Sequence, residues 1–350
     1  MTRPVLAIGP ANHAGQADAW CAAVRENLAA DAWSFGYDPL GPPLPFRFAV
    51  DRTIGKYSYR NPVLRGARSR AFFRGATHIA LDGHLPCFHM KRQGNVGAYA
   101  RQLAEMGYRV ALIAHGSDVR DPDLHMNHDP WSYFRDGSQK WLDSVRELTA
   151  YNRAMAESLG FPVFYSTPDL AVDLPTATWL PVCLDVTAWR TDAAVLERTV
   201  PRVLHVPSNS AVKGTPYIEP ILQQLAANGI IEYISPRSLP HSKMRRLVWS
   251  CDVVVDQILL GSYGVAAVEA MAAGRVVVGR VRDDVKARLP QSPHIVDATP
   301  ADLAEVMLSI LERREELRAK AAENVAYVRR WHDGRESALR LAGYLGVETD

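Results

Sequence analysis

Residues 253–274, VVVDQILLGSYGVAAVEAMAAG, carry the pattern that decides the fold. The β-branched apolar run Val253–Asp256 is typical of a buried strand. Glycines and small residues follow it and lead into a helical stretch, Gly264–Ala273. A second apolar run, Arg275–Val278, comes directly afterwards. A strand, a helix and another strand in this order predict a parallel sheet covered by helices.

The same alternation extends over the chain and starts twice, first at Val5 and again at Val203. The remaining predicted strands are Val5–Ile8, His78–Leu81, Arg109–Ala114, Val163–Tyr165, Val203–Val206, Ile230–Ile234 and Ile295–Val296. The remaining predicted helices are Gly15–Leu28, Gly97–Met106, Ser144–Leu159, Ile218–Ala227, Ala301–Arg329 and Arg335–Leu345. Thr299 is expected to cap the helix over Ala301–Arg329, because Pro300 follows it at the first helical position.

Two Rossmann-like domains follow from this restart. We predict an N-terminal domain over residues 1–181 and a C-terminal domain over residues 182–330. The Pro- and Thr-rich stretch Leu174–Pro181 is interpreted as the linker between them. Residues 331–350 are expected to form a C-terminal helix that packs back on the N-terminal domain. The sequence therefore predicts the α/β class with parallel sheets.

Length and charge exclude several classes of protein. The 350 residues suit two α/β domains of ordinary size. The net charge of +2, from 40 basic and 38 acidic side chains, and the lack of a long basic run argue against a nucleic-acid partner. We see no apolar stretch long enough for a transmembrane helix and no leader pattern after Met1, so the cytoplasm is the expected location. The four cysteines are scattered, which argues against a disulfide framework or a structural zinc site.

A polar loop, Ser208–Thr215, follows the strand that opens the second domain. Ligands of open parallel sheets bind outside the carboxyl ends of the strands. Lys213 in this loop can reach a phosphate, and the helix that follows adds free N–H groups and a positive dipole end. The alternative is an ordinary solvated lysine.

Glu269 stands in the helix that follows the glycine-containing loop, between Val268 and Ala270. A carboxylate among small apolar neighbours needs a partner, and two ribose hydroxyls are a chemically sensible one. The alternative, a surface glutamate, is disfavoured by the apolar neighbours.

Together these residues resemble the donor site of retaining glycosyltransferases of family 4. The resemblance rests on Lys213-Gly214 and, further along, Tyr263-Gly264, Glu269-Ala270 and Gly274. It implies the GT-B fold, in which two Rossmann-like domains with parallel sheets face a central cleft. It also implies that Lys213 holds the donor diphosphate, that Tyr263 and Gly264 lie against phosphate and sugar, and that Glu269 binds the ribose hydroxyls.

The chain departs from the family pattern at two positions. Gly261 stands where the family has a first glutamate, and Ser208 stands where it often has an arginine. Arg237 is the candidate that would supply a compensating positive charge. The predicted donor-binding residues are Gly15, Ser208, Lys213, Gly214, Arg237, Ser262, Tyr263, Gly264 and Glu269.

Two segments of the first domain follow strands and are expected to line its ligand face. Gly9–Gln16 lacks the GxGxxG pattern of dinucleotide binding. In the glycosyltransferases that the chain resembles, this loop approaches the donor phosphate and the acceptor, and the resemblance therefore implies that Asn12 and His13 contact the acceptor. The segment His115–Asp118 resembles a family segment at the cleft. We predict that His115 acts in catalysis beside the donor sugar and that Asp118 shapes the acceptor site. The alternative is a local helix cap.

Some clusters contain metal-ligand residue types without the usual spacing of a zinc site. They are His84–His89, His125–Asp129 and Asp121–Asp123. No metal and no other cofactor is therefore expected. The aromatic and Arg-rich region Phe35–Arg74 is predicted to border the acceptor. Tyr57 and Tyr59 are candidates for stacking on a sugar or aglycone, whereas Phe72 and Phe73 are interpreted as core.

The predicted activity is transfer of a sugar from a nucleotide-activated donor to an acceptor hydroxyl, by a hexosyltransferase-type enzyme. The resemblance implies retention of anomeric configuration. Lys213 and helix N-termini would stabilise the leaving diphosphate. Two alternatives stay open. One is a catalytically inactive nucleotide- or sugar-binding partner protein, which the losses at Ser208 and Gly261 favour. The other is a sugar-nucleotide epimerase, which would need acid and base carboxylates.

Overall fold

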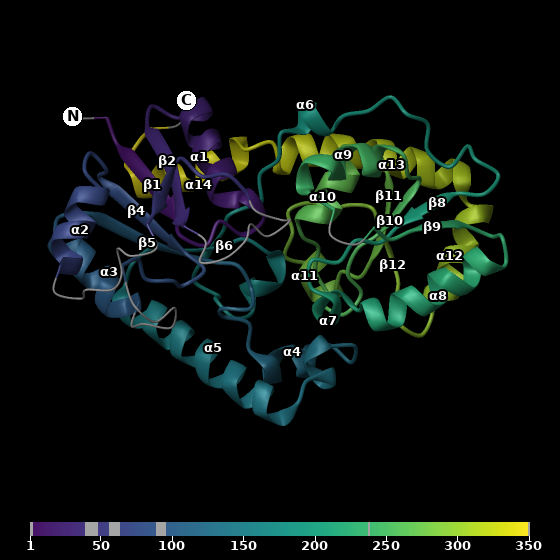
Figure 1. Cartoon of the computed structure of the whole chain (residues 1–350), viewed down its shortest axis with the longest axis horizontal. Helices are drawn as coiled ribbons and strands as arrows, with labels where there is room; N and C mark the ends of the chain where they lie inside the picture. The colour runs from purple at the N-terminus through teal and green to yellow at the C-terminus, as the bar shows by residue number, and fades with distance from the viewer. Residues whose placement is uncertain (1–2, 39–47, 56–63, 89–95, 237–238, 349–350) are drawn as a thin grey trace. The chain divides into compact units, whose positions relative to one another are not determined.

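The computed structural model describes residues 3–38, 48–55, 64–88, 96–236 and 239–348. Within these ranges the strands form two sheets, one of seven strands in the order β3-β2-β1-β4-β5-β6-β7 and one of five in the order β12-β11-β10-β8-β9. All the pairings are parallel, and helices cover the sheets (Figure 1). The predicted α/β class with parallel sheets is confirmed.

The strands of the first sheet are β1 Val5–Gly9, β2 Asp31–Tyr37, β3 Arg52–Ile54, β4 His78–Asp82, β5 Arg109–Ala114, β6 Val163–Tyr165 and β7 Thr178–Trp179. Those of the second are β8 Arg202–Leu204, β9 Glu232–Ile234, β10 Val253–Val255, β11 Val276–Gly279 and β12 Ile295–Asp297. The helices are α1 Gln16–Asn27, α2 Arg65–Phe72, α3 Val96–Glu105, α4 Pro122–His128, α5 Gln139–Leu159, α6 Val186–Trp189, α7 Ser210–Lys213, α8 Thr215–Ala227, α9 His241–Trp249, α10 Val265–Ala272, α11 Asp283–Lys286, α12 Leu303–Glu312, α13 Arg314–Trp331 and α14 Arg335–Leu345.

The chain divides into two compact units. The first contains residues 1–121, 145–183 and 334–350, and the second contains residues 122–144 and 184–333. Helix α14 belongs to the first unit, where its Leu341 and Leu345 pack with Trp20 of α1 in one apolar cluster. The C-terminal helix therefore packs against residues far away in the chain.

Residues 122–144 belong to the second unit, although the predicted division places them in the N-terminal domain. His125 Nε2 is hydrogen-bonded to the Leu260 carbonyl at 2.9 Å, and Tyr133 N donates to the Leu259 carbonyl at 3.3 Å. Nothing local marks this segment as part of the second unit, because the residues that hold it lie far along the chain.

Three strands of the first sheet were not predicted, namely β2, β3 and β7. In β2 the apolar run is broken by Ser34, whose buried hydroxyl is hydrogen-bonded to Asp18 at 3.1 Å and Asp51 at 3.2 Å. Strand β7 lies inside the stretch predicted as a linker and is only two residues long. It exists because its backbone pairs with β6, an interaction that leaves no periodic pattern in the sequence.

The single helix predicted over Ala301–Arg329 is two helices, α12 and α13, which meet at Arg313. The first of them begins at Leu303 and not next to Pro300. Thr299 does not cap a helix through its side chain. Its N–H and hydroxyl both donate to Asp302 Oδ1, at 2.6 and 2.9 Å, and this local turn delays the helix.

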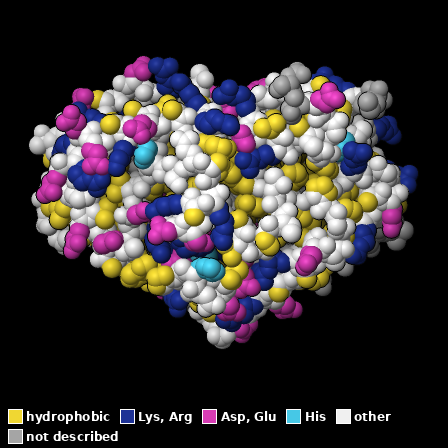
Figure 2. All heavy atoms as spheres, turned by 180° about the vertical axis from the view of Figure 1, so that it is seen from behind, with side chains coloured by type: hydrophobic (Ala, Val, Ile, Leu, Met, Phe, Trp, Pro, Cys, Tyr) yellow, Lys and Arg dark blue, Asp and Glu magenta, His cyan; other side chains and the backbone are white. Residues whose placement is uncertain are grey.

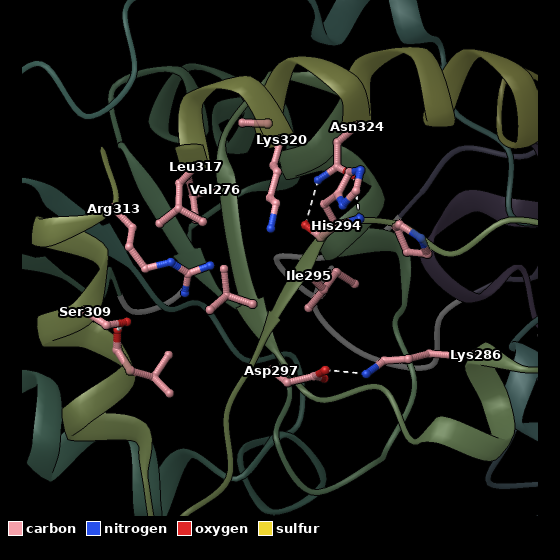
Figure 3. Close-up of a pocket in the computed structure, with 14 residues that line it drawn as sticks. Val276, Lys286, His294, Ile295, Asp297, Ser309, Arg313, Leu317, Lys320 and Asn324 are labelled. Carbon is pink, nitrogen blue, oxygen red and sulfur yellow. Dashed lines mark hydrogen bonds and ion pairs between the residues drawn. The ribbon is translucent and has the colours of Figure 1, made fainter. Parts of the chain in front are cut away.

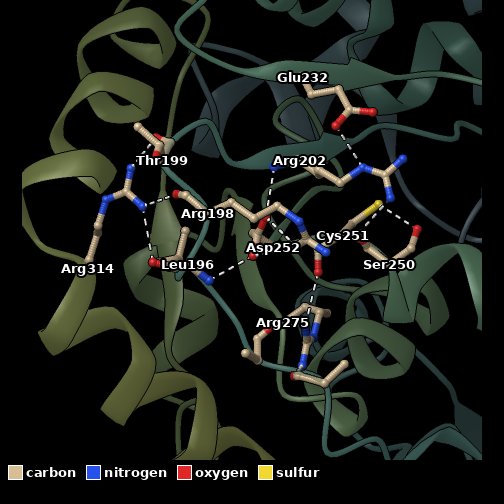
Figure 4. A network of polar contacts seen from close by, with 12 residues as sticks. Leu196, Arg198, Thr199, Arg202, Glu232, Ser250, Cys251, Asp252, Arg275 and Arg314 are labelled. Atoms are coloured by element: carbon tan, nitrogen blue, oxygen red, sulfur yellow. Dashed lines mark hydrogen bonds and ion pairs between the residues drawn. The ribbon is translucent and has the colours of Figure 1, made fainter.

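A polar network ties the segment before β8 to the second sheet (Figure 4). Asp252, at the amino end of β10, accepts hydrogen bonds from Leu196 N and Arg202 N, each at 2.8 Å, and pairs with Arg198 at 3.0 Å. Arg275 donates to the carbonyls of Ala193, Ala194 and Cys251. Burial of these charges is tolerated because each has several partners, so Asp252 serves the structure of the second unit.

Two aromatic residues that the sequence assigns to the core lie in one apolar cluster of the first unit. Phe73 is fully buried and Phe72 packs on the same apolar cluster, which confirms the interpretation of both as core.

On the face shown in Figure 2, basic and acidic side chains are interspersed, so no large field of one sign lies there. Among the described helices none is long and apolar enough to cross a membrane.

Candidate functional site

Each sheet has one place where successive connections turn in opposite directions. In the second sheet this place lies between the neighbours β8 and β10, and in the first between β1 and β4. Ligands of open parallel sheets bind there, outside the carboxyl ends of the strands. In the second unit the loops at this place hold Lys213, Asp256 and Gly261–Gly264, which with Glu269 and His241 we call the Lys213 subsite. In the first unit we call Asn12, His13, Asp82, His115 and Asp118 the Asp82 subsite.

Lys213 ends the short helix α7, which Asn209 caps by accepting a hydrogen bond from Val212 N at 3.3 Å. Gly214 follows with a φ of +81°, and a Cβ there would lie 2.8 Å from Ile258 Cγ1. Only glycine fits this close approach, which explains the Lys-Gly pair. The Lys213 ammonium forms an ion pair with Asp256, and the lysine side chain is 13% exposed.

Glu269 lies in α10 and is 5% exposed. Its Oε1 is hydrogen-bonded to His241 Nε2 at 2.7 Å. Burial raises the pKa of the Glu269 carboxyl above its usual value, although the hydrogen bond from His241 and the charge of Lys213 act in the opposite direction. The charge of Asp256 also acts on Glu269, so Lys213, Asp256 and Glu269 form one electrostatic cluster. The structure thus brings together the two residues most central to the predicted donor site.

His205 holds the loop of Lys213 through two hydrogen bonds. It is buried, with Nδ1 at 2.8 Å from the Val255 carbonyl and Nε2 at 2.9 Å from Thr215 Oγ1. Burial lowers the pKa of His205, and the charge of Lys213 acts in the same direction. The imidazole therefore links the end of β10 to the start of α8 and fixes the loop that carries Lys213.

Tyr263 does not offer its side chain to a ligand surface. It is 3% exposed, and its hydroxyl is hydrogen-bonded to the Tyr327 hydroxyl at 2.7 Å and lies 3.4 Å from His332 Nε2. Ser262 is also buried, and its carbonyl accepts a hydrogen bond from Gln257 Nε2 at 2.6 Å. These contacts hold the loop before α10, so the role that the resemblance implies for Tyr263 falls at most on its backbone.

The surroundings of Gly261 leave no room for the glutamate that the family pattern has at this position. Its φ is +71°, and a Cβ there would lie 2.6 Å from Arg282 Cγ and 3.0 Å from Asp129 Oδ2. Asp129 is held by an ion pair with Arg280, and Arg282 is held by Asp284 at 2.8 Å. A side chain at this position would displace buried, paired charges.

The remaining predicted donor residues are Ser208, Gly264, Gly15 and Arg237. Ser208 is exposed in the loop before α7. Gly264 precedes α10 and has nothing within 4 Å of where a Cβ would lie, so the start of this helix is open. Gly15 is in the first unit at the start of α1, with a φ of +76° and Phe48 against it. Arg237 lies outside the described residues.

The Asp82 subsite is built around a fully buried carboxylate at the end of β4. Asp82 accepts hydrogen bonds from Ala11 N at 2.6 Å and Asn12 N at 2.8 Å, and its Oδ2 lies 3.3 Å from His115 Nε2. His115 stacks on Trp20 with ring centroids 5.7 Å apart. His13 is exposed and meets the His115 ring edge-on at 4.9 Å. The loop after β1 and the loop after β5 are therefore joined through Asp82.

Asp118 is buried and its carboxylate is already engaged. It accepts hydrogen bonds from Gly116 N at 2.7 Å and His115 N at 3.0 Å, and lies 2.8 Å from His84 Nδ1. Burial opposes ionisation, but the hydrogen bond and charge of His84 hold the pKa of Asp118 well below its usual range. Its contacts make Asp118 the residue that shapes the turn carrying His115. No helix begins in residues 115–121, so the contacts are not those of the helix cap considered as the alternative.

The residues considered for metal binding have other partners. His125 Nδ1 is hydrogen-bonded to Ser132 Oγ at 2.7 Å, Asp129 pairs with Arg280, and Asp121 pairs with Arg153 at 2.6 Å. Within the described ranges no three His, Cys, Asp or Glu side chains are grouped to hold a metal ion. His89, Tyr57 and Tyr59 lie outside these ranges.

A cavity of about 370 Å³ lies elsewhere in the second unit, beside the edge strand β12 and helices α12 and α13 (Figure 3). Its basic side chains have acidic partners. Lys286 pairs with Asp297, and Arg313 and Lys320 both pair with Glu316. Its residues come from neither switch point, so it is separate from the Lys213 subsite.

Three residues of the two subsites, Asp82, Asp256 and His241, were not predicted as site residues, and neither was His84, the partner of Asp118. Asp82 ends an apolar strand, and Asp256 directly follows one, which is the signal that could have found them. His84 and His241 show no comparable signal, because their partners Asp118 and Glu269 lie far away in the chain.

Comparisons with known proteins support the fold. No protein-family profile and no curated protein sequence matches the chain. Among solved structures, HepE from Anabaena in complex with UDP and glucose is similar over 99% of this chain and 100% of its own, with 12% identity and a TM-score of 0.60. Sucrose-phosphate synthase from Thermosynechococcus elongatus is similar over 98% of both chains, with 14% identity and a TM-score of 0.60.

WaaG, a glycosyltransferase involved in lipopolysaccharide biosynthesis, is similar over 97% of this chain and 99% of its own, with 12% identity and a TM-score of 0.54. The neighbours share the two-sheet architecture with this chain over nearly their whole length. The fold is GT-B. A shared GT-B fold at such low identity leaves the chemistry to be argued from the two subsites.

Proposed function

We propose that this protein is a glycosyltransferase that moves a sugar from a nucleoside-diphosphate donor to an acceptor hydroxyl with retention of anomeric configuration. The observation that carries the proposal is the cluster of Lys213, Asp256 and Glu269 at the β8/β10 switch point. A cation for a diphosphate and a buried carboxylate for ribose hydroxyls are the chemistry that such a donor requires. The GT-B neighbours support it, and HepE was crystallised with UDP and with UDP-glucose.

In this proposal the donor diphosphate binds at Lys213 and at the open start of α10. As the bond from the anomeric carbon to the diphosphate oxygen breaks, negative charge grows on the leaving group. The Lys213 ammonium stabilises that charge and need only exchange its partner Asp256 for the diphosphate. Because the ion pair holds Lys213 in place before the donor arrives, little side-chain entropy is lost on binding.

Glu269 selects the ribose part of the donor. Its carboxylate accepts hydrogen bonds from two vicinal hydroxyls, in exchange for the bond from His241. Burial raises the pKa of Glu269 and so disfavours its charged form, and hydrogen bonds from ribose hydroxyls would offset that cost. The Asp82 subsite, with His115 and His13, is proposed to receive the acceptor.

The first test is a thermal-shift screen with UDP, GDP and ADP and with UDP-glucose, GDP-mannose and ADP-glucose. A ligand at about 100 times its Kd stabilises the native state by about 2.7 kcal/mol, which raises Tm by roughly 5–10 °C. The shift should disappear in Lys213→Ala and Glu269→Gln. Lys286→Ala is the matched control, because this lysine lies in the same unit but pairs with Asp297 beside the separate cavity.

The second test follows the chemistry with the sugar nucleotide that binds. Release of nucleoside diphosphate in the presence of acceptor sugars supports transfer, and the anomeric configuration of the product decides retention. Conversion of the donor to its epimer would support the epimerase alternative. Binding without turnover over a broad acceptor panel would support the inactive partner protein. No shift with any nucleotide would remove the donor-site assignment.

A further inference from the structure

Asp256 is a buried carboxylate that follows β10 and has no predicted function. The residue is 4% exposed, and its backbone N–H donates to the Val278 carbonyl at 2.8 Å. One carboxylate oxygen, Oδ1, forms the ion pair with Lys213. The other, Oδ2, is buried and has no hydrogen-bond partner among the described residues. A buried carboxylate oxygen without a hydrogen-bond partner is energetically unfavourable, so a functional explanation for Asp256 is needed.

The charge of Asp256 is costly at this place. Glu269 already supplies one carboxylate to the same cluster, and the charge of Asp256 further raises the pKa of Glu269. Two carboxylates beside a diphosphate site also repel the diphosphate. A second negative charge is therefore better explained by a neutral hydrogen-bond donor in the ligand than by the diphosphate itself. The hydroxyls of the donor sugar are such donors.

The loop that Asp256 opens lacks the carboxylate that the family pattern places at Gly261. No side chain fits at Gly261, because Arg282 and Asp129 occupy the space. The loop thus has Gly261 in place of the glutamate of the family pattern, and it begins with Asp256, which was not predicted as a site residue. Asp256 is the only carboxylate between the end of β10 and Gly264.

From these observations we infer that Asp256 binds the donor sugar, as a hydrogen-bond acceptor for one of its hydroxyls. This inference rests on the proposed function. In the structure, the Asp256 carboxylate holds the Lys213 ammonium. When the ammonium turns to the diphosphate, the carboxylate is free to accept a hydrogen bond from a sugar hydroxyl. The ion pair therefore couples the two halves of donor recognition: diphosphate binding at Lys213 frees the carboxylate that reads the sugar.

The experiment compares each nucleoside diphosphate with the sugar nucleotide of the same base, by isothermal titration calorimetry on the full chain. The pairs are UDP with UDP-glucose, GDP with GDP-mannose, and ADP with ADP-glucose. The variants are Asp256→Asn and, in case this variant fails to fold, Asp256→Ser. The matched control is Asp252→Asn. Asp252 is equally buried at the opposite end of the same strand, and its partners lie in the structural network of Figure 4.

The expected result is a selective loss of sugar recognition. Asp256→Asn should raise the Kd of the sugar nucleotide by about 10- to 100-fold, the effect of losing one charge-assisted hydrogen bond. The Kd of the matching nucleoside diphosphate should change by less than about threefold, because the variant loses the ion pair that holds Lys213 in place but also loses the carboxylate that competes with the diphosphate for its ammonium. Asp252→Asn should lower Tm and leave both Kd values unchanged.

Other outcomes would overturn the inference in distinguishable ways. Equal weakening of both ligands means that Asp256 only positions Lys213. No weakening of either means that it contributes nothing to the donor. If the wild-type chain binds none of the six nucleotides, the proposed function itself fails and Asp256 loses its ligand.

Discussion

Replacing Gly261 by alanine tests whether sterics exclude the missing glutamate. The methyl group would lie 2.6 Å from Arg282 Cγ and 2.9 Å from Arg282 Cδ, far inside contact distance. Arg282 cannot easily move away, since its side chain is 5% exposed and is held by Asp284 at 2.8 Å. Crowding of this kind costs about 1–3 kcal/mol. The left-handed backbone adds about 1–2 kcal/mol for any residue with a Cβ.

Gly229→Ala provides the matched control. Gly229 lies in the same unit and has the same φ of +71°, but a Cβ there would have nothing within 4 Å. The control therefore measures the backbone cost without the crowding. Since alanine also restricts the unfolded chain, which offsets about 0.4–1 kcal/mol, we expect Gly229→Ala to cost about 1 kcal/mol and Gly261→Ala about 2–4 kcal/mol.

The stability of both variants is measured by urea denaturation followed by tryptophan fluorescence. At an unchanged m-value, the shift in the transition midpoint gives the change in the free energy of unfolding relative to wild type. The nucleotide-induced Tm shift should also shrink in Gly261→Ala, whose loop carries part of the proposed donor site, and should persist in Gly229→Ala. If Gly261→Ala costs no more than Gly229→Ala, the explanation by Arg282 and Asp129 is wrong, and the glutamate is absent for a functional reason.

Three further predictions concern buried polar groups. Burial raises the pKa of Asp173 to about 6 from 3.8. The free energy of unfolding of the wild-type protein therefore falls by about 3 kcal/mol as pH rises from about 4 to 8. Asp173→Asn should be more stable than wild type at about pH 8 and should lose that advantage at about pH 4, as measured by urea denaturation at each pH. An advantage that does not change with pH would contradict this. The pKa of Glu269 is likewise raised above 4.5, so the wild type loses stability as pH rises through it. Relative to wild type, Glu269→Gln should gain stability between acid and neutral pH in the same assay while nucleotide binding is lost; a loss of stability at neutral pH would refute the sign. Tyr263→Phe should cost about 1–2 kcal/mol through the lost bond to Tyr327 but leave nucleotide Kd nearly unchanged, and a large loss of affinity at unchanged Tm would instead place the hydroxyl at the donor.

Much of the Lys213 subsite was predictable because its signals are local. Lys213-Gly214 and the loop before α10 follow strands directly, and a parallel sheet brings the loops after its strands to one edge. The pairing of Lys213 with Asp256 and of Glu269 with His241 was not predictable. These side chains come from different loops and helices, and their approach depends on how α9 and α10 pack in the second unit.

The sequence by itself determined the α/β class, most strands and the candidate positions Lys213 and Glu269, because strand periodicity, glycine loops and helix patterns act over a few residues. Only the tertiary structure decided that Tyr263 is buried on Tyr327, that residues 122–144 belong to the second unit, and that Gly261 has no room for a side chain. It also decided that Asp118 shapes a loop and that Asp256 carries an unpartnered oxygen. Each of these depends on contacts between residues far apart in the chain, and no local pattern encodes such contacts.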